Sequence, residues 1–425
     1  MTDKDFQVKK ACDESQPIFS CYCRYALILL LAVNLLNYID RQILYAVFPL
    51  IKDDLGLSDA ALGFLGSAFM ICYMVSAPLL GWLGDRISRV KLAANGLVLW
   101  SVATAVAGVA PGYLTLLTAR TMVGIGEASF GTVSPGLIAD YFPLERRGRM
   151  LSYFYLAIPV GSAIGYVLGG ILGHAFGWHA AFLLVGIPGL LLAIPIWLLR
   201  EPVRGGRDRS AKGFVDGYMK NYVLLFINRS FILNTLAMAA MTFALGGLAQ
   251  WVPTFLYREH GLDVEKANTL FGGITVLAGI TGTLTGGWLG DYFQQKHGKG
   301  YLTVSGWGFI AGAPITAYAL FTHSLPGCIA AMFCAEFFLF LNTGPLNTVI
   351  VNVTRPGMRA MAFAVNIFFI HALGDAVSPT LLGLLSDVHG LRAALLTTPI
   401  VILVAAIFCF SCSRFIQEDS AKVTG

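Results

Sequence analysis

The sequence has little charge, since Asp, Glu, Lys and Arg make up 12% of its 425 residues, whereas soluble domains carry about 25%. Hydrophobic residues make up 56% of the chain, and 47 residues are glycine. This composition excludes an ordinary soluble globular protein and predicts an all-α integral membrane protein.

Motifs for catalysis and for ATP binding are also missing. No GxxxxGK[ST] run occurs, so ATP is not expected to drive this protein. The apolar segments contain neither His/Glu metal-ligand spacing nor a Ser–His arrangement. We therefore expect no enzyme, no cofactor and no metal site. The first twenty residues lack an apolar core before a small-residue cleavage site, so no removable signal peptide is expected.

Apolar segments recur along the whole chain instead. Each has roughly 20 residues, which is enough for a helix to cross about 30 Å of hydrocarbon. We predict twelve membrane-spanning helices, at 24–49, 60–83, 91–109, 113–139, 149–173, 177–199, 229–256, 267–289, 301–321, 325–352, 357–385 and 391–413.

The basic residues predict the orientation of these helices. The termini and the even-numbered connections hold 23 of the 29 basic residues, and the odd-numbered connections hold only Lys52, Arg258, Lys266 and Arg392. Because basic residues accumulate on the cytoplasmic side, both termini are expected there, in a multi-pass protein of the plasma (inner) membrane. The net charge of +5 then reflects membrane topology, and no nucleic acid is expected as a partner.

The eight cysteines predict no disulfide framework. Five of them fall on the expected cytoplasmic, reducing side. Cys409 and Cys412 have CxxC spacing, but they lie at the end of an apolar helix, where we interpret them as small buried residues.

An internal repeat divides the chain into two similar halves. The pentapeptide "GWLGD" occurs at 81–85 and again at 287–291, and "GWHAAFLL" at 177–184 corresponds to "GLRAALLT" at 390–397. We expect a six-helix bundle at 1–199, a second at 229–425, and between them a cytoplasmic linker at 200–228. The later part of this linker is a candidate amphipathic helix.

The segment "GWLGDRISRVK" (81–91) resembles the loop motif of the major facilitator superfamily, and with twelve helices the resemblance covers nearly the full chain. It implies two halves that rock about a central site. Ser88 replaces the second glycine of the motif. The matching residues are Gly81, Asp85, Arg86, Arg89 and Lys91.

In that resemblance the motif locks the cytoplasmic ends of the helices together. Asp85 is then expected to act as a latch, with nearby charges in the next cytoplasmic loop as its partners. Asp291 holds the corresponding place in the second half. The loop charges are Asp140, Arg146 and Arg149.

Three further phrases resemble the spinster branch of this superfamily. They are "NYIDRQ" (37–42), "GIGEASFGTVSPGLIADYFP" (124–143) and "HALGDAVSP" (371–379). The resemblance implies export of lysolipids or sphingoid phosphates.

Four charged residues lie at bilayer depth in the first half, where an unpaired charge is costly. At about 1.5 Å per residue, Asp40 and Arg41 lie roughly 24 Å from the inner end, between Glu127 at roughly 18 Å and Arg120 at roughly 28 Å. We therefore expect Arg41 to pair with Glu127 and Asp40 with Arg120. This network is a candidate for proton coupling, and the alternative is a static staple between helices one and four.

The second half has no copy of this network. At the corresponding depth, "MTFALGGLAQWVP" (241–253) is small and apolar, and only Glu336 and Asp375 remain as interior carboxylates. An apolar wall facing a charged wall suits an amphiphile, although apolar side chains in membrane helices more often pack or face lipid. The candidate substrate-cavity residues are Arg41, Glu127, Phe243, Trp251, Glu336, Phe337, Asn342, Asn366, His371 and Asp375.

We therefore predict a monomeric, proton-coupled secondary transporter of an amphipathic lipid such as a lysolipid or sphingoid phosphate, working by alternating access among membrane lipids. One alternative is a proton-coupled carrier of drugs or small organic ions. Another, of a different class, is an uncoupled lipid channel or scramblase.

Overall fold

The computed structural model describes residues 17–84, 86–142, 150–151, 153–203, 224–355 and 358–424, and the regular structure assigned in these ranges is helical. Eleven helices in this part of the chain are long and apolar enough to cross a membrane. The twelfth predicted span is α6 (Tyr113–Tyr141), which has 29 residues and carries Arg120, Glu127 and Asp140 among its apolar side chains. Each of the twelve predicted spans is thus occupied by helix.

In the first half of the sequence, local signals set several helix ends. Ser88 caps α5 by accepting a hydrogen bond from the backbone of Lys91, and Gly177 turns the chain between two helices with φ of +81°. Besides α6, the helices are α2 (Pro17–Ala46), α3 (Phe48–Leu55), α4 (Asp59–Gly84), α5 (Arg89–Ala107), α8 (Ala157–Phe176) and α9 (Trp178–Trp197).

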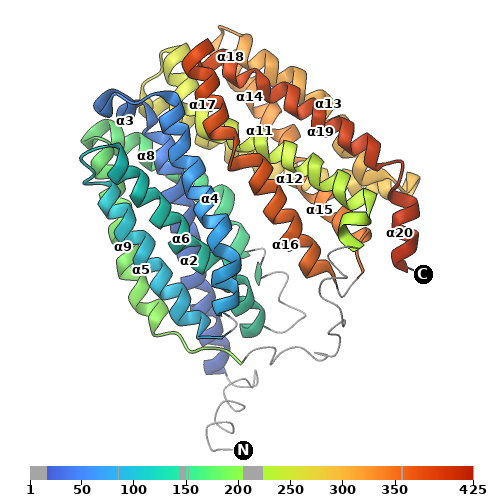
Figure 1. Cartoon of the computed structure of the whole chain (residues 1–425), viewed down its shortest axis with the longest axis horizontal. Helices are drawn as coiled ribbons and strands as arrows, with labels where there is room; N and C mark the ends of the chain where they lie inside the picture. Colours follow the sequence, from blue (N-terminus) through green and yellow to red (C-terminus); the bar gives the residue numbers. More distant parts are fainter. Residues whose placement is uncertain are drawn as a thin grey trace, which may run out of the picture. The chain divides into compact units, whose positions relative to one another are not determined.

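In the second half, two long helices end at glycines in the left-handed conformation, Gly261 and Gly298. Figure 1 shows the helices of the second half in yellow-green to red. They are α11 (Arg229–His260), α12 (Val264–His297), α13 (Gly300–Phe321), α14 (Leu325–Phe340), α15 (Thr343–Asn352), α16 (Arg359–Ile370), the π-helical turn η2 (His371–Asp375), α17 (Ser378–His389), α18 (Leu391–Leu395), α19 (Thr397–Cys412) and α20 (Ile416–Thr424).

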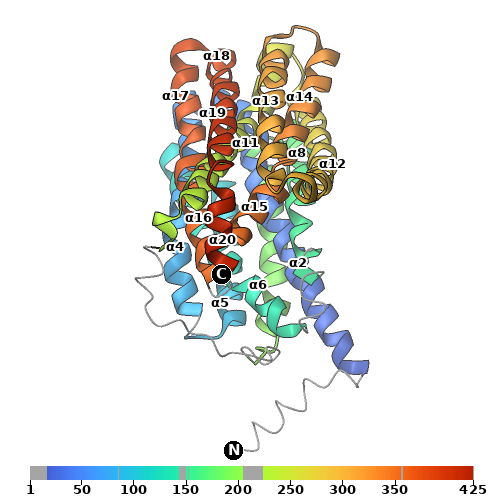
Figure 2. The same cartoon turned by 90° about the vertical axis from the view of Figure 1, so that its right-hand side faces the viewer.

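Two predicted spans of the second half are interrupted. The span 325–352 breaks between α14 and α15, where the side chain of Asn342 donates to the carbonyl of Phe338 at 2.6 Å. The other break is at η2, where Gly374 has φ of −101° and ψ of −106°, and Figure 2 shows α16 and α17 following one another across it. A side chain at Gly374 would meet Thr242 of α11, so the bend brings the two backbones close together.

Backbone contacts group the chain into two compact units. Unit 1 comprises Met1–Arg41, Cys72–Ser162 and His179–Lys212, and unit 2 comprises Gln42–Ile71, Ala163–Trp178 and Gly213–Gly425. Within unit 2, α13 packs against α14 and α19, and α11 packs against α19. One part of the first half of the sequence, the start of α4, belongs to unit 2 because it packs on α17. There the Cβ of a side chain at Gly63 would lie 2.2 Å from the carbonyl oxygen of Pro379.

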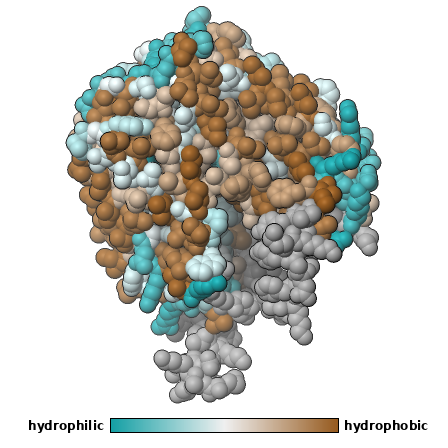
Figure 3. Space-filling view, in the orientation of Figure 1, coloured by the Kyte–Doolittle hydropathy of each residue, from teal (hydrophilic) through white to brown (hydrophobic). Residues whose placement is uncertain are grey.

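Exposed apolar side chains cover the helix faces (Figure 3), including Leu79, Leu191 and Ile400, each more than 60% exposed. The hydrophilic residues of α20 stand out at the right edge of the same view. Such a surface suits lipid contact along the helices and water at their ends.

Candidate transport site and gates

The charged site of unit 1 is centred on Arg41 of α2. Its Nε atom lies 2.7 Å from Oε2 of Glu127 on α6. The guanidinium also lies over the rings of Tyr38 and Tyr73, 5.0 and 5.1 Å from their centroids. The Arg41 side chain is 16% exposed, whereas that of Glu127 is fully buried. A cation held between two aromatic faces and one carboxylate is fixed in position, and here it remains partly exposed.

The second ion pair of this site is closed to solvent. Arg120 donates to Asp40 at 3.2 Å, and the hydroxyl of Thr104 donates to the same carboxylate. Asp40 is 1% exposed and Arg120 is 0% exposed. Because successive residues of a helix point about 100° apart, Asp40 and Arg41 reach different partners on α6. These are the two pairs that the comparison of depths predicts.

The candidate polar residues of the second half make fewer charged contacts than the two ion pairs of unit 1. Glu336 is 3% exposed, and its Oε2 atom has no hydrogen-bond partner among the described residues. His371 contacts Asp375 through Nδ1 at 2.9 Å, across the π-helical turn. Asn366 is buried on α16.

The predicted aromatic lining is largely packed. Trp251 is fully buried, and its indole donates to the carbonyl of Pro379 at 3.2 Å. Phe337 lies against Phe338, with ring centroids 5.5 Å apart, and Phe243 is half-buried. The amide nitrogen of Asn342, another candidate lining residue, donates to the carbonyl of Phe338 in the preceding helix α14.

In unit 1, an ion cluster joins helix ends on the side of the even-numbered connections. Arg89, at the start of α5, lies 2.7 Å from Asp140 of α6 and 2.8 Å from Glu201, which follows α9. Glu201 also accepts hydrogen bonds from the hydroxyl of Ser88 and the backbone of Val90, so it caps α5 from a distance. Glu201 is not among the site residues predicted from the sequence, although an acid directly after the sixth span is a visible signal.

The other predicted latch residues take different positions. Asp85, Arg146 and Arg149 lie outside the described residues. Arg86 lies over Trp82 at 3.8 Å, and Asp291 accepts a hydrogen bond from Tyr301 at 2.7 Å. At Gly81, the first residue of the motif, an added Cβ would meet no described atom within 4 Å apart from its own stretch of helix.

A second charged cluster, which was not predicted from the sequence, lies in unit 2 on the side of the odd-numbered connections. Asp59 of α4 accepts from Lys52 at 2.6 Å and from both terminal nitrogens of Arg258 at 2.6 and 2.8 Å, and the hydroxyl of Ser386 also donates to it. Asp387 caps α4 by accepting from the backbone of Asp59 at 2.7 Å. The signal was that Lys52 and Arg258 are two of only four basic residues on this side.

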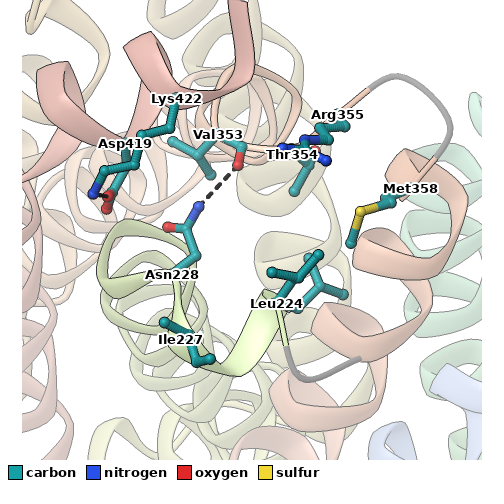
Figure 4. Close-up of a pocket in the computed structure, with 10 residues that line it drawn as sticks. Leu224, Ile227, Asn228, Val353, Thr354, Arg355, Met358, Asp419 and Lys422 are labelled. Carbon is teal, nitrogen blue, oxygen red and sulfur yellow. Dashed lines mark hydrogen bonds and ion pairs between the residues drawn. The ribbon is translucent and has the colours of Figure 1, made fainter. Parts of the chain in front are cut away.

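The C-terminal helix α20 is fixed to the start of α11. Asp419 accepts from the backbone and the hydroxyl of Ser230, at 3.1 and 2.8 Å. Burial alone would raise the pKa of this carboxyl, but the hydrogen bonds from Ser230 and Lys422 outweigh it and lower the pKa. Figure 4 shows Asn228 bonded to the carbonyl of Val353 at the rim of a neighbouring cavity.

Comparison with known proteins identifies the family to which this chain belongs. The Major Facilitator Superfamily model matches residues 30–379, and the chain belongs to that superfamily of multi-pass membrane transporters. Within it the chain is spinster-like. It is 34% identical to Protein spinster homolog 1 of Xenopus laevis, over 93% of this chain and 81% of that protein.

Two other relatives support the same assignment. Protein spinster of Drosophila melanogaster is 35% identical, and the match spans 84% of this chain but 60% of that protein's length. The sphingosine-1-phosphate transporter SPNS2 of Mus musculus is 31% identical, over 92% of this chain and 77% of that protein.

The fold also matches a solved structure. A bacterial homolog of the human lysosomal transporter Spinster, in an inward-facing and unoccupied conformation, superposes with a TM-score of 0.87 at 25% identity. The match covers 94% of this chain and 98% of that one.

Proposed function

We propose that this transporter moves an amphipathic lipid with an anionic headgroup, such as a lysolipid or sphingoid phosphate, and couples that movement to protons. The observation that supports the proposal best is the unequal exposure of the Arg41–Glu127 pair. Arg41 can be reached by a ligand, while the carboxylate that neutralises it is buried.

The coupling that we propose is a competition for one guanidinium. Arginine remains protonated at all relevant pH values, so the proton must be carried by a carboxylate. When an anionic headgroup binds Arg41, Glu127 loses its counter-charge, and a buried carboxylate without a partner favours protonation. Binding of the lipid and uptake of a proton by Glu127 would then accompany one another.

The two ion pairs have different roles in this proposal. Asp40 and Arg120 are both shielded, and the hydroxyl of Thr104 also donates to Asp40. We assign this pair to holding α2 and α6 together, and we assign the proton to Glu127. The relative named as a sphingosine-1-phosphate transporter supports the choice of substrate class. The orientation with cytoplasmic termini belongs to the same proposal.

Uptake by proteoliposomes tests the proposal. Lysophosphatidic acid, sphingosine-1-phosphate and a cationic dye are supplied in parallel, with and without an imposed pH gradient. We expect the pH gradient to accelerate uptake of a lipid but not of the dye. Faster uptake of the dye alone would favour a drug carrier, and equal lipid movement with and without the gradient would indicate an uncoupled channel or scramblase.

A further inference from the structure

One face of α11 forms a ridge that runs from the charged cluster around Asp59 to the His371–Asp375 pair. Gly246, Gln250, Thr254 and Arg258 follow one another at four-residue spacing. At about 1.5 Å per residue this ridge is roughly 18 Å long, more than half the thickness of a bilayer's hydrocarbon core. One end contacts Asp59, and the other approaches Asp375.

The contacts of this ridge run along the seam between α4, α11 and α17. The Cβ of a side chain at Gly66 of α4 would lie 2.5 Å from Oε1 of Gln250. At Gly246 it would lie 2.6 Å from the Cβ of Asp375 and 3.3 Å from the hydroxyl of Ser378. The seam is therefore lined by polar groups of α11, η2 and α17, and α4 meets it at Gly66.

These polar groups are buried but unsatisfied. Gln250, Thr254 and Ser378 are each at most 1% exposed. Both polar atoms of the Gln250 amide and the hydroxyls of Thr254 and Ser378 have no hydrogen-bond partner among the described residues. Leaving such groups unpaired costs about 1–3 kcal/mol each. Buried polar groups in proteins are normally paired, and ordered water is the usual partner when no protein group is available.

We propose that a file of water molecules fills this seam and gives protons a path from the Asp59 cluster to the His371–Asp375 pair. One water that bridges two groups spans about 5.5 Å, which is close to the roughly 6 Å between successive ridge positions. The use of the path by protons rests on the proposed coupling, whereas the presence of water does not.

The proton transfer is balanced at each step. A water in the file accepts one proton and releases another to the next water, so every water ends with two hydrogens. The last proton is taken by His371, whose imidazolium then pairs with the carboxylate of Asp375. Thr242, Gly246 and Ser378 are the neighbours that the close approaches at Gly246 and Gly374 identify on the adjoining helices, and none of them titrates.

The mouth of the path has balanced charge and is too narrow for a lipid. Lys52 and Arg258 offset Asp59 and Asp387, and the adjacent pair Arg392–Glu259 is also neutral. Gly63 and Gly383 bring the backbones of α4 and α17 together, since a Cβ at either would lie 2.2–2.3 Å from a facing carbonyl oxygen. The seam would thus admit protons while excluding the substrate.

Hydration of the seam is tested first, on the full chain in nanodiscs. Hydroxyl radicals formed from bound water by X-ray radiolysis label side chains beside that water. Trp251 is fully buried and follows Gln250, so it reports on the seam. We expect Trp251 to be labelled in the wild type and labelled at least fivefold less in the double variant Gln250→Leu, Thr254→Val. Equally weak labelling of both proteins would overturn the water file.

Proton movement is tested in proteoliposomes with the same variants. Thr254→Val alone provides a milder change if the double variant folds poorly. The control is Thr235→Val, which removes another buried, unsatisfied hydroxyl of α11 beyond the end of the ridge. We expect lipid uptake driven by a pH gradient to slow at least tenfold in the double variant, and exchange without a gradient to match the wild type and the control. Unchanged proton-driven uptake would refute the path, whereas absence of proton drive in the wild type would refute the coupling itself.

Discussion

The two halves of the duplicated sequence treat buried charge differently. The first half holds four charges in two ion pairs, Arg41–Glu127 and Asp40–Arg120. The second half holds Glu336, for which the described residues provide no ion pair, and the weakly exposed pair His371–Asp375. Its helices are also broken, at Asn342 and at the π-helical turn. The two halves of the repeat therefore differ in how their polar residues are paired.

This difference bears on how the halves contribute to transport. A network of paired buried charges is rigid and specific, because removing any member leaves its partner buried without a counter-charge. A single carboxyl can be neutral when it is buried, so it tolerates change more easily. We infer that the first half holds the substrate-binding cation and the carboxylate that carries the proton, and that the second half provides bending and the proposed proton path.

The largest effect should come from breaking the shielded pair. Arg120→Met leaves Asp40 buried without its cation, and losses of this kind cost about 3–5 kcal/mol. We expect a large fall in the midpoint of thermal unfolding in detergent. Adding Asp40→Asn should restore part of the lost stability, since the stranded charge is removed. If Arg120→Met alone and Asp40→Asn alone both unfolded at the wild-type midpoint, the pair would not hold α2 to α6.

A smaller effect is expected at the odd-connection side of unit 2. Asp59→Asn removes the negative charge that Lys52 and Arg258 share, and a hydrogen bond to a charged group contributes about 1.5–3 kcal/mol. We expect the seam between α4 and α17 to open more often. Maleimide labelling of Ser67→Cys, followed by mass spectrometry, should then be about tenfold faster.

The matched control for this change is Asp53→Asn, an exposed acid in the preceding helix α3. Its labelling rate should equal that of the parent. Equal rates for the Asp59 variant and this control would mean that the cluster is not a gate.

The contact between Asp419 of α20 and Ser230 at the start of α11 should contribute about 1 kcal/mol to the free energy of unfolding, as helix caps do. The folded-state pKa of Asp419 is lowered, so its contribution is present above the unfolded pKa and is lost as the pH falls through the folded value. We expect Asp419→Ala to reduce stability at pH 7 and to flatten the acid limb of the stability profile. Glu418→Ala, which removes the neighbouring acid that contacts only Lys422 among the described residues, should leave that limb unchanged.

The smallest effect is expected from Glu336→Gln. The glutamine has the same shape, and the described residues hold no cation that this change would strand. We expect a change of less than about 1 kcal/mol in unfolding free energy, within the range of ordinary substitutions. A loss as large as that of Arg120→Met would show that the second half also depends on a charged centre.

Much of the fold follows from local sequence properties. Apolar runs predicted the twelve spans because hydropathy and length determine which segments can cross a bilayer. The partners of Asp40 and Arg41 followed from depth alone, since helical rise converts sequence position into height. The helix breaks were not predicted, because Asn342 and Gly374 act through contacts with neighbouring turns and with α11.

The polar contacts at the helix ends were harder to predict. Glu201, Asp387 and Asp419 each cap a helix that begins more than a hundred residues away in the sequence. A capping residue close to its helix leaves a sequence signature, but a carboxylate supplied by a distant helix end leaves none. Such contacts can be recognised only once the helices have been placed side by side.

The proposed role of Glu127 is tested most directly by the pH dependence of lipid exchange. Exchange of sphingosine-1-phosphate is measured in proteoliposomes at equal pH on both sides, from pH 5 to 9, for the wild type, Glu127→Gln and Asp40→Asn. The account predicts a rate that varies with pH in the wild type and in any Asp40→Asn protein that folds, and a flat profile in Glu127→Gln. The same pH profile in the wild type and in Glu127→Gln would contradict it.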